Sequence, residues 1–366
     1  MNVLIVSGIW PPDVGGPASH APEVAEFLLE RGHGVRALVS AAAPPAPAPY
    51  PVEWVDRRLP PGVRHARGVA RIAALARGAD VVYTTGMLDR SAAGCRLARR
   101  PYVVKLTADP AYERARRLGL TAASLAAFQR ERTLRTLPLR ASRDRVVGGA
   151  AHVVAPSAFL RELALAWGAR GATVLPNPAP SVDGLPPRAE LRRRLGFDGP
   201  TLAYAGRLVA QKDLGTAIEA ARTAGLPFVL AGDGPERPVL ERLGHARFLG
   251  PLPRAQVLEL FRAADASVLS SAWENFPHGA VESLAAGTPV AATDVGGVRE
   301  VVRDEENGLL VPPHDVAALA AALRRLVEEP ALLERLRAGS APSVVELAPE
   351  RVYGRLLEIL LAAAVT

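Results

Sequence analysis

The chain has 366 residues, of which 49% are apolar and 22% charged, with one cysteine and a formal net charge of +7. This length allows two or three domains. The composition excludes wholesale disorder, and a single cysteine excludes a disulfide framework. No apolar run is long enough to span a bilayer, and the start, Met-Asn-Val-Leu-Ile-Val, has no basic leader segment. We therefore expect a cytoplasmic protein.

The positive charge is unevenly distributed. Residues 1–185 carry 24 Lys and Arg against 14 Asp and Glu, whereas the remainder carries 20 against 23. Such a basic half favours an anionic partner, either nucleic acid, an anionic membrane surface or a phosphorylated substrate, although a solvated helix face has the same pattern. Only Lys105 and Lys212 are lysines, which marks both as candidates for a role that a compact ammonium fills better than a guanidinium. The scarcity of Asn, Gln and Met is typical of a heat-adapted protein or of a biased genome.

The first half predicts alternating strands and helices. A strand is expected at residues 3–6, followed by a glycine-containing loop, an amphipathic helix and a second strand at 35–39. This order predicts a parallel sheet. We assign 1–180 to a doubly wound domain with further strands at 80–84, 102–106, 152–155 and 173–175.

The proline-rich stretch 176–187 predicts a linker, because proline suits neither helix interiors nor central strands. A second α/β domain is expected at 181–348, and an amphipathic helix at 349–366 that packs back on the first domain. Two such domains place the site in a cleft at the carboxyl ends of the strands. The strands of the second domain are expected at 202–204, 228–231, 247–249, 267–269, 289–292 and 308–311, with helices near 213–224, 235–243, 254–263, 279–286 and 315–328.

Three motifs carry chemistry. Gly15-Gly16 lies before the first helix and lets the backbone approach an anion, or forms a plain turn. Arg207 and Lys212, just after the first strand of the second domain, are suited to a diphosphate, the first as a fork and the second as a point charge. The third motif is Glu274 to Glu282, two carboxylates suited to sugar hydroxyls, which flank Asn275, Phe276, Pro277, His278 and Gly279 at a predicted helix start.

Together these residues resemble retaining glycosyltransferases of family 4, whose E-x7-E signature Glu274 and Glu282 reproduce. The resemblance covers nearly the whole chain and is most specific over residues 200–330. It implies the GT-B fold, in which two Rossmann-like domains face each other across a cleft and a C-terminal helix crosses back to the first. The family binds a nucleotide sugar in the second domain and the acceptor in the first.

The resemblance also implies residue roles. Arg207 and Lys212 would hold the donor diphosphate, with Gly16 approaching it from the first domain. Glu274 would contact the transferred sugar and Glu282 the ribose hydroxyls, and backbone near Leu252 would read the base. No D-x-D sequence occurs, in line with the family's usual independence of a metal. We therefore expect neither metal nor cofactor.

Two positions depart from the family pattern. Where many members carry a histidine near the fourth strand, this chain has Lys105 and Asp109. We expect Asp109 to accept a hydrogen bond from an acceptor hydroxyl, and Lys105 to support it or to bind an acceptor phosphate. His278 replaces Asn or Gly, and either touches the sugar or fills the loop.

The expected activity is transfer of a hexosyl group from a nucleotide diphosphate sugar to a hydroxyl of a glycan, lipid-linked or small-molecule acceptor. The alternatives are a GT-B-type epimerase or phosphorylase and a sugar-nucleotide-binding protein without catalysis.

We do not expect nucleic-acid binding, because the basic segment 96–145 has few interleaved aromatic residues. Peripheral docking on an anionic membrane is a further hypothesis, motivated by Leu118, Leu120 and Leu125 among arginines at 114, 116, 117, 130, 132 and 135.

Overall fold

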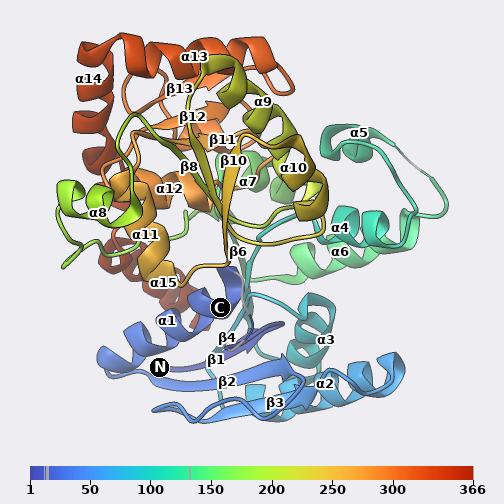
Figure 1. Cartoon of the computed structure of the whole chain (residues 1–366). Coiled ribbons are helices and arrows are strands. Elements are labelled where there is room, and N and C mark those ends of the chain that lie inside the picture. Colours follow the sequence, from blue (N-terminus) through green and yellow to red (C-terminus); the bar gives the residue numbers. More distant parts are fainter. Residues whose placement is uncertain (12, 14–15, 132, 366) are drawn as a thin grey trace. The chain divides into compact units, whose positions relative to one another are not determined.

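The computed structural model describes residues 1–11, 13, 16–131 and 133–365 (Figure 1). The chain divides into two compact units, Met1–Pro176 with Val352–Thr366 and Asn177–Arg351. These limits differ by a few residues from the expected 1–180, 181–348 and 349–366.

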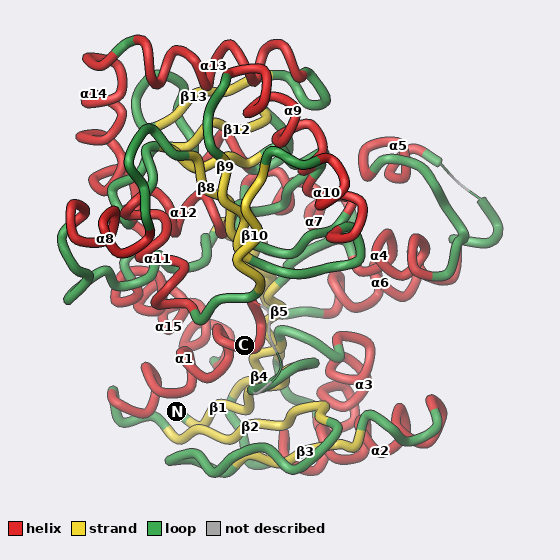
Figure 2. Tube along the Cα trace, viewed as in Figure 1, coloured by secondary structure: helices red, strands yellow, loops and turns green. Residues whose placement is uncertain are grey.

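The first unit is built on a seven-stranded parallel sheet of order β3-β2-β1-β4-β5-β6-β7. Helices α1 and α15 cover one of its faces, and α2, α3, α6 and α7 cover the other (Figure 2). The elements are β1 (Asn2–Ser7), α1 (Gly16–Glu30), β2 (Gly34–Ala41), β3 (Val52–Asp56), α2 (Pro61–Ala76), β4 (Val81–Thr84), α3 (Leu88–Ala98), β5 (Tyr102–Lys105), α4 (Pro110–Arg117), α5 (Leu125–Arg130), α6 (Leu137–Gly149), β6 (His152–Ala155), α7 (Ala158–Ala166), β7 (Ala172–Val174) and α15 (Pro349–Ala364).

The second unit is built on a six-stranded parallel sheet of order β10-β9-β8-β11-β12-β13. Helices α9, α10, α13 and α14 cover one face, and α8, α11 and α12 the other. The elements are α8 (Arg188–Leu195), β8 (Leu202–Ala205), the 3₁₀ turn η1 (Ala210–Lys212), α9 (Leu214–Ala224), β9 (Phe228–Ala231), α10 (Arg237–Leu243), β10 (Ala246–Gly250), α11 (Arg254–Ala263), β11 (Ala266–Leu269), α12 (His278–Ala285), β12 (Val290–Thr293), η2 (Val298–Glu300), β13 (Gly308–Val311), α13 (Val316–Glu328), α14 (Pro330–Ser340) and η3 (Ala341–Leu347).

Alternation of side chains across each strand explains how these sheets bury both faces. In β8, Leu202 and Tyr204 pack toward α9 and α13, whereas Ala203 between them packs toward α8 and α11. A sheet covered by helices on both sides needs such continuous apolar strands. The predicted pair of doubly wound parallel sheets is confirmed. So is the return of the C-terminal helix, because Val352, Leu356 and Leu360 lie in the core of the first unit.

Three elements, β3, α8 and α14, were not predicted, and α14 follows α13 directly, with Pro330 as its first residue. Strand β3 carries Val-Glu-Trp-Val-Asp at the sheet edge, and only Val55 in it is fully buried. Helix α8 buries only Leu191 and is otherwise rich in arginine. Both present one thin apolar stripe, so their patterns are too weak to stand out from the neighbouring proline-rich segments.

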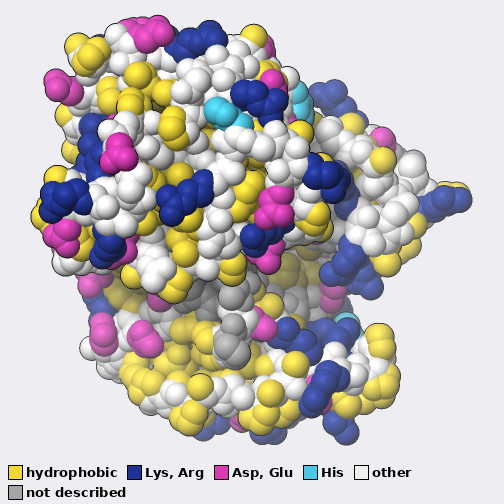
Figure 3. Space-filling model, viewed as in Figure 1, with side chains coloured by type: hydrophobic (Ala, Val, Ile, Leu, Met, Phe, Trp, Pro, Cys, Tyr) yellow, Lys and Arg dark blue, Asp and Glu magenta, His cyan; other side chains and the backbone are white. Residues whose placement is uncertain are grey.

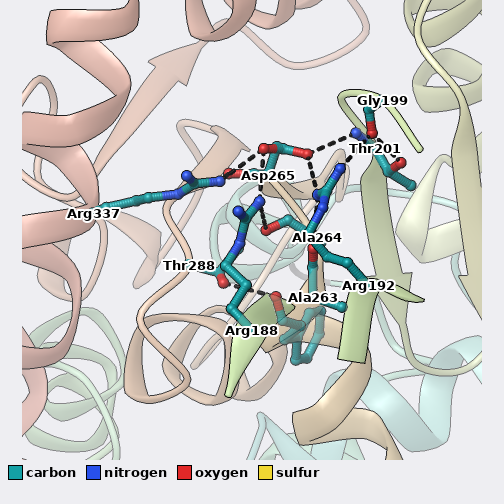
Figure 4. A network of polar contacts seen from close by, with 10 residues as sticks. Arg188, Arg192, Gly199, Thr201, Ala263, Ala264, Asp265, Thr288 and Arg337 are labelled. Carbon is teal, nitrogen blue, oxygen red and sulfur yellow. Dashed lines mark hydrogen bonds and ion pairs between the residues drawn. The ribbon is translucent and has the colours of Figure 1, made fainter. Parts of the chain in front are cut away.

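The carboxylate of Asp265 ties the amino-terminal edge of the second sheet together (Figure 4). Asp265 directly precedes β11 and accepts hydrogen bonds from the backbone N–H of Thr201 (2.9 Å), from Arg192 (2.9 Å), from Arg188 (2.7 Å) and from Arg337 (2.8 Å). These partners come from the start of β8, from α8 and from α14. One half-buried anion therefore joins three separate segments at the amino-terminal edge of the sheet.

Candidate functional site

The strand order of the second unit reverses between β8 and β11, which is where doubly wound sheets bind ligands. The loops after β8, β9 and β10 pack backbone against backbone there. Gly206 N–H donates to Ala231 O (3.0 Å), Gly232 N–H to Gly250 O (2.7 Å), and Leu208 N–H to Asp233 O (2.9 Å). These bonds form a floor at the carboxyl ends of three adjacent strands.

Two glycines make this close approach possible. A Cβ atom on Gly232, where φ is +136°, would lie 1.9 Å from the carbonyl oxygen of Gly206. A Cβ atom on Gly234 would lie 2.2 Å from the carbonyl oxygen of Leu208. Neither distance admits a side chain, so the Gly-Asp-Gly segment has a packing role whatever it binds.

Lys212 and Glu274 meet at this edge, although 62 residues separate them in the chain. The Lys212 ammonium donates to Oε1 of Glu274, and the hydroxyl of Ser271 donates to the same oxygen (2.9 Å). Glu274 is 6% exposed, and the Lys212 side chain 18%. Within the part of the chain that the structure describes, no contact is recorded for Oε2 of Glu274. That oxygen is therefore left to accept a hydrogen bond from a ligand.

Backbone contacts hold the Glu274 loop in place. The N–H of Gly297 donates to the carbonyl of Glu274 (3.2 Å), and a Cβ atom on Gly296 would lie 1.9 Å from that carbonyl oxygen. The side-chain amide of Gln211, beside Lys212, donates to Trp273 O (2.9 Å), and the backbone carbonyl of Gln211 accepts from Ala272 N–H (2.8 Å). The loop after β12 and the turn η1 thus fix the loop that carries Glu274.

Arg207 is exposed in the loop after β8, and none of the described residues forms an ion pair with it. Its carbonyl accepts a hydrogen bond from the hydroxyl of Tyr204 (3.0 Å). Burial, reinforced by the nearby Glu274 carboxylate and opposed by the Arg207 guanidinium, raises the pKa of Tyr204. The tyrosine therefore stays a neutral donor that fixes the backbone of Arg207 while its guanidinium remains available.

Glu282 lies on α12, with its Oε1 3.7 Å from Nε of Arg254 at the start of α11. Burial raises the pKa of Glu282, and the Arg254 guanidinium partly opposes this shift. Leu252, in the loop that leads from β10 to α11, is half-buried against the α8 and α11 side of the core. A carboxylate and an arginine therefore meet at the start of α11, just after the loop that contains Leu252.

The segment between the two glutamates places the start of α12 over the end of β8. A Cβ atom on Gly279 would lie 3.5 Å from the carbonyl oxygen of Ala205. Asn275, Phe276 and Pro277 are buried, whereas His278 is exposed. The His278 ring packs edge-on against Phe276, and its Nε2 lies 3.0 Å from Nδ2 of Asn177. These contacts give His278 a place in the loop and do not decide between its two expected roles.

In the first unit, Gly15 lies outside the described residues, and Gly16 is the first residue of α1. Lys105, at the end of β5, is 2% exposed and donates from Nζ to Leu175 O (2.7 Å). Burial lowers the pKa of Lys105 to about 7. A buried ammonium whose recorded partner is a backbone carbonyl is not placed to receive an acceptor phosphate without a rearrangement.

Asp109 is buried, and its carboxylate accepts hydrogen bonds from other residues of the first unit. It caps α4 by accepting from the N–H groups of Ala111 (2.9 Å) and Tyr112 (3.2 Å) through Oδ1. Its Oδ2 accepts from Arg143 and from Gln129, both at 2.8 Å. Both oxygens are therefore engaged, which argues against the expected contact with an acceptor hydroxyl and favours a structural role.

Three members of the site were not predicted as site residues: Ser271, Tyr204 and Arg254. Their residue types are common in loops and strands, and no spacing rule singles them out. Only the folded chain brings the Ser271 hydroxyl to Glu274 and Arg254 to Glu282.

No group of three or more His, Cys, Asp or Glu among the described residues is arranged to hold a metal ion. In the same part of the chain, every helix is too short or too polar to cross a membrane.

Solved structures show which fold the two sheets build. Sucrose-phosphate synthase from Thermosynechococcus elongatus is similar with a TM-score of 0.80 and 22% identity, covering 99% of this chain and 100% of its own. The Anabaena protein HepE in complex with UDP-glucose is similar with a TM-score of 0.77 and 21% identity, covering 98% of this chain and 99% of its own. At these identities the likeness concerns the fold, which is GT-B, as expected.

Curated relatives match about half of the chain. They include an α-D-kanosaminyltransferase of Streptomyces kanamyceticus, 36% identical over 168 residues (42% of this chain), and a D-inositol 3-phosphate glycosyltransferase of Thermomonospora curvata, 38% identical over 197 residues (48% of this chain). The matches span only 44% and 46% of these two relatives.

Family models account for most of the sequence. Residues 15–178 match the glycosyl transferase 4-like domain, and residues 187–341 match the glycosyl transferases group 1 model. The two matched ranges fall on the two structural units, and the second contains Arg207, Lys212, Glu274 and Glu282. The chain therefore belongs to the group 1, family 4 type of GT-B glycosyltransferases.

Proposed function

We propose that this protein transfers a hexosyl group from a nucleotide diphosphate sugar to an acceptor hydroxyl, with retention at the anomeric carbon and without a metal ion. The observation that carries the proposal is the convergence of Lys212 and Glu274 beside Arg207 at the switch point of the second sheet. The transferase names of the relatives and the UDP-glucose in the HepE structure support it.

Two cations suit the leaving diphosphate. The Arg207 guanidinium offers a planar fork of donors to phosphate oxygens. The Lys212 ammonium has three N–H groups, of which Glu274 takes one, so two remain for the ligand. Charge fixed in this way stabilises the departing diphosphate as it forms and takes the place of a divalent ion.

Paired carboxylates suit the two hydroxyl-bearing parts of the donor. Oε2 of Glu274 accepts from a hydroxyl of the transferred sugar, while Lys212 and Ser271 hold Oε1. Glu282 accepts from the ribose hydroxyls beside Arg254, and backbone groups near Leu252 contact the base. The sugar is thereby oriented with its anomeric carbon toward the acceptor.

The chemical step we propose exchanges one bond for another on a single face of the sugar. The acceptor oxygen bonds to the anomeric carbon as the bond from that carbon to the phosphate oxygen breaks. The acceptor proton passes to the departing phosphate oxygen. Side chains position the two substrates and stabilise charge, and none of them forms a covalent intermediate.

A Lys212→Ala variant tests the central claim. Turnover should fall by about 10² to 10³, the loss typical of one preorganised charge donor. The matched control is Arg242→Ala, which removes an exposed cation from α10 in the same unit and should leave turnover within about twofold. A fall of less than about threefold for Lys212→Ala would remove this lysine from the mechanism.

Further measurements test the remaining parts. A thermal-shift screen against a panel of nucleotide sugars should identify the donor, because ligand binding raises the melting temperature.

NMR of the product's anomeric proton should show the same anomeric configuration as in the donor, and an inverted configuration would refute retention. EDTA should leave the rate unchanged, and restoration of an EDTA-inhibited enzyme by Mg²⁺ or Mn²⁺ would refute metal independence.

A second proposal is that the first unit docks peripherally on an anionic membrane that presents a lipid-linked acceptor. Leu118 (56% exposed), Leu134 (88%) and Leu137 (51%) stand among exposed arginines at 116, 117, 130 and 135. Arg132 lies outside the described residues, and Leu125 is buried, which excludes it from this surface. Flotation with anionic liposomes should recover the protein, and equal recovery with neutral liposomes would end the proposal.

A further inference from the structure

An open cavity of about 990 Å³ lies wholly within the first unit. Its walls come from α3, the start of β5, the second half of α6 and the residues just before β6 and β7, with one residue each from α2 and α4. Those strand starts lie at the opposite edge of the sheet from the strand end that carries Lys105. Basic side chains gather around α3 and α6 (Figure 3). The six arginines that line the cavity are Arg96, Arg99, Arg100, Arg114, Arg145 and Arg170.

The charge of this cavity is poorly balanced by the protein. Asp89 is the one acidic side chain among the described lining residues, and it accepts a hydrogen bond from Ser142. Arg100 donates to the carbonyl of Arg77 (3.1 Å), and no ion pair with a described carboxylate is recorded for any of the six arginines. The carboxyl ends of α3 and α6 each contribute about half a negative charge. A net charge of about +4 therefore remains around one open cavity whose six arginines are all exposed to solvent.

Arg99 occupies a position that would suit glycine better. It ends α3 in the left-handed conformation, with φ at +54°. A glycine at this position would remove the steric strain that a Cβ atom causes in the left-handed conformation. Arg99 is also exposed. The chain thus places a long cation at a backbone position where fold stability alone favours glycine.

We propose that this arginine-lined cavity binds a compact ligand that carries two or more phosphate groups. The volume is within the range of small-molecule sites. Each phosphomonoester brings about −1.5 to −2 charges at neutral pH, so two of them match the unbalanced charge. Guanidinium forks engage phosphate oxygens in pairs. Apolar walls from Pro101, Tyr102 and Val146 are left for the body of the ligand.

The phosphates could come from a soluble metabolite or from a lipid headgroup, and calorimetry separates the two sources. The soluble probes are fructose 1,6-bisphosphate and inorganic tripolyphosphate, and the bilayer probe is phosphatidylcholine vesicles with or without cardiolipin. Each probe is titrated into the full chain and into Lys212→Ala, in which the diphosphate-binding lysine of the second unit is removed. Binding at the cavity should be the same in both proteins.

Two variants alter the cavity and one serves as a matched control. Arg145→Gln and Arg99→Gly should each weaken binding about tenfold or more, because each removes charge-assisted hydrogen bonds. Arg99→Gly should also keep or raise the melting temperature, so a loss of binding cannot be assigned to misfolding. Arg36→Gln removes an exposed arginine on β2, outside the cavity lining, and should leave binding within about twofold.

The outcomes are distinct. Arginine-dependent binding of the soluble probes assigns the site to a soluble ligand, and the same dependence seen only with cardiolipin vesicles assigns it to a lipid headgroup. An equal loss in Arg36→Gln would show general charge attraction and overturn the site. Loss of all binding in Lys212→Ala would place the probes in the second unit, and no saturable binding of any probe would refute the proposal.

Discussion

Lys105 is a lysine that the fold holds away from water. Its Nζ donates to the Leu175 carbonyl, and burial lowers its pKa to about 7, against about 10.4 for an unfolded lysine. Between these two pH values the unfolded chain binds more protons than the folded one, so stability rises with pH across that range. Below it, the ammonium is charged in both states and its burial costs free energy in full.

We therefore predict that Lys105→Met is more stable than the wild type at pH 6. The methionine keeps much of the side-chain volume and removes the buried charge. The gain in melting temperature should shrink as the pH rises toward about 10, where the wild-type lysine is neutral in the folded state. Thermal melts from pH 6 to 10 measure this, and a pH-independent difference would contradict it.

Asp109 is coupled to Arg143, whose guanidinium also stacks 4.2 Å from the Trp167 ring centre. In Asp109→Asn the helix cap survives, because asparagine also caps helices, but the buried Arg143 loses its buried carboxylate partner and keeps only the more exposed Asp144. We predict a loss of about 3 kcal/mol in the free energy of unfolding, the lower end of the cost typical of a broken buried ion pair.

In the same variant, the KM for the acceptor should be unchanged in the fraction that remains folded. Urea unfolding and acceptor titration measure the two quantities separately. An increase in the acceptor KM without loss of stability would contradict this prediction and support the contact with an acceptor hydroxyl that the sequence led us to expect.

At the scale of the elements, the Glu274 loop depends on the glycine that lies against it. A Cβ atom on Gly296 would meet the Glu274 carbonyl oxygen at 1.9 Å, so Gly296→Ala must displace this loop. We predict a fall in turnover of about tenfold to a hundredfold, because small misplacements at a reacting centre are costly.

Gly287→Ala is the matched control for that variant. Gly287 also has a positive φ (+82°), but a Cβ atom there meets nothing within 4 Å. Both variants should lose about 1 kcal/mol of stability from the backbone conformation. Only Gly296→Ala should lose turnover, and equal turnover in the two variants would show that the loop position is unimportant.

The order of elements was largely predictable because its signals are local. The apolar runs of β1 and β2 and the helical period of α1 each fall within one short window of sequence. Strand β3 and helix α8 were missed because each has little apolar surface of its own. Both elements are stabilised by packing against neighbouring segments, and a local sequence pattern does not reveal such tertiary contacts.

At the scale of the whole molecule, Asp265 links several segments of the second unit through its hydrogen bonds. Burial would raise the pKa of Asp265, but the Thr201 N–H and the guanidinium groups of Arg192, Arg188 and Arg337 outweigh it and lower the pKa. The carboxylate therefore contributes stability above its unfolded pKa of about 3.9, which is lost as the pH falls through the lower folded value.

Replacing this carboxylate should destabilise the second unit. We predict that Asp265→Asn loses on the order of 3 kcal/mol at pH 7, since three arginines lose a shared partner. The difference from the wild type should narrow below about pH 4, where the carboxylate takes up a proton in the unfolded chain before it does so in the folded one. Chemical denaturation at pH 7 and at pH 3 tests this, and a constant difference would contradict it.

The sequence by itself determined the two doubly wound sheets, the family and the motifs from Gly206 to Lys212 and from Glu274 to Glu282. Each depends on residues close together in the chain. Tertiary structure alone decided which charges meet: Lys212 with Glu274, Asp109 with Arg143, and six arginines around one cavity. A local pattern reports which residues avoid water, but the partner of a buried or crowded charge depends on segments that only folding brings together.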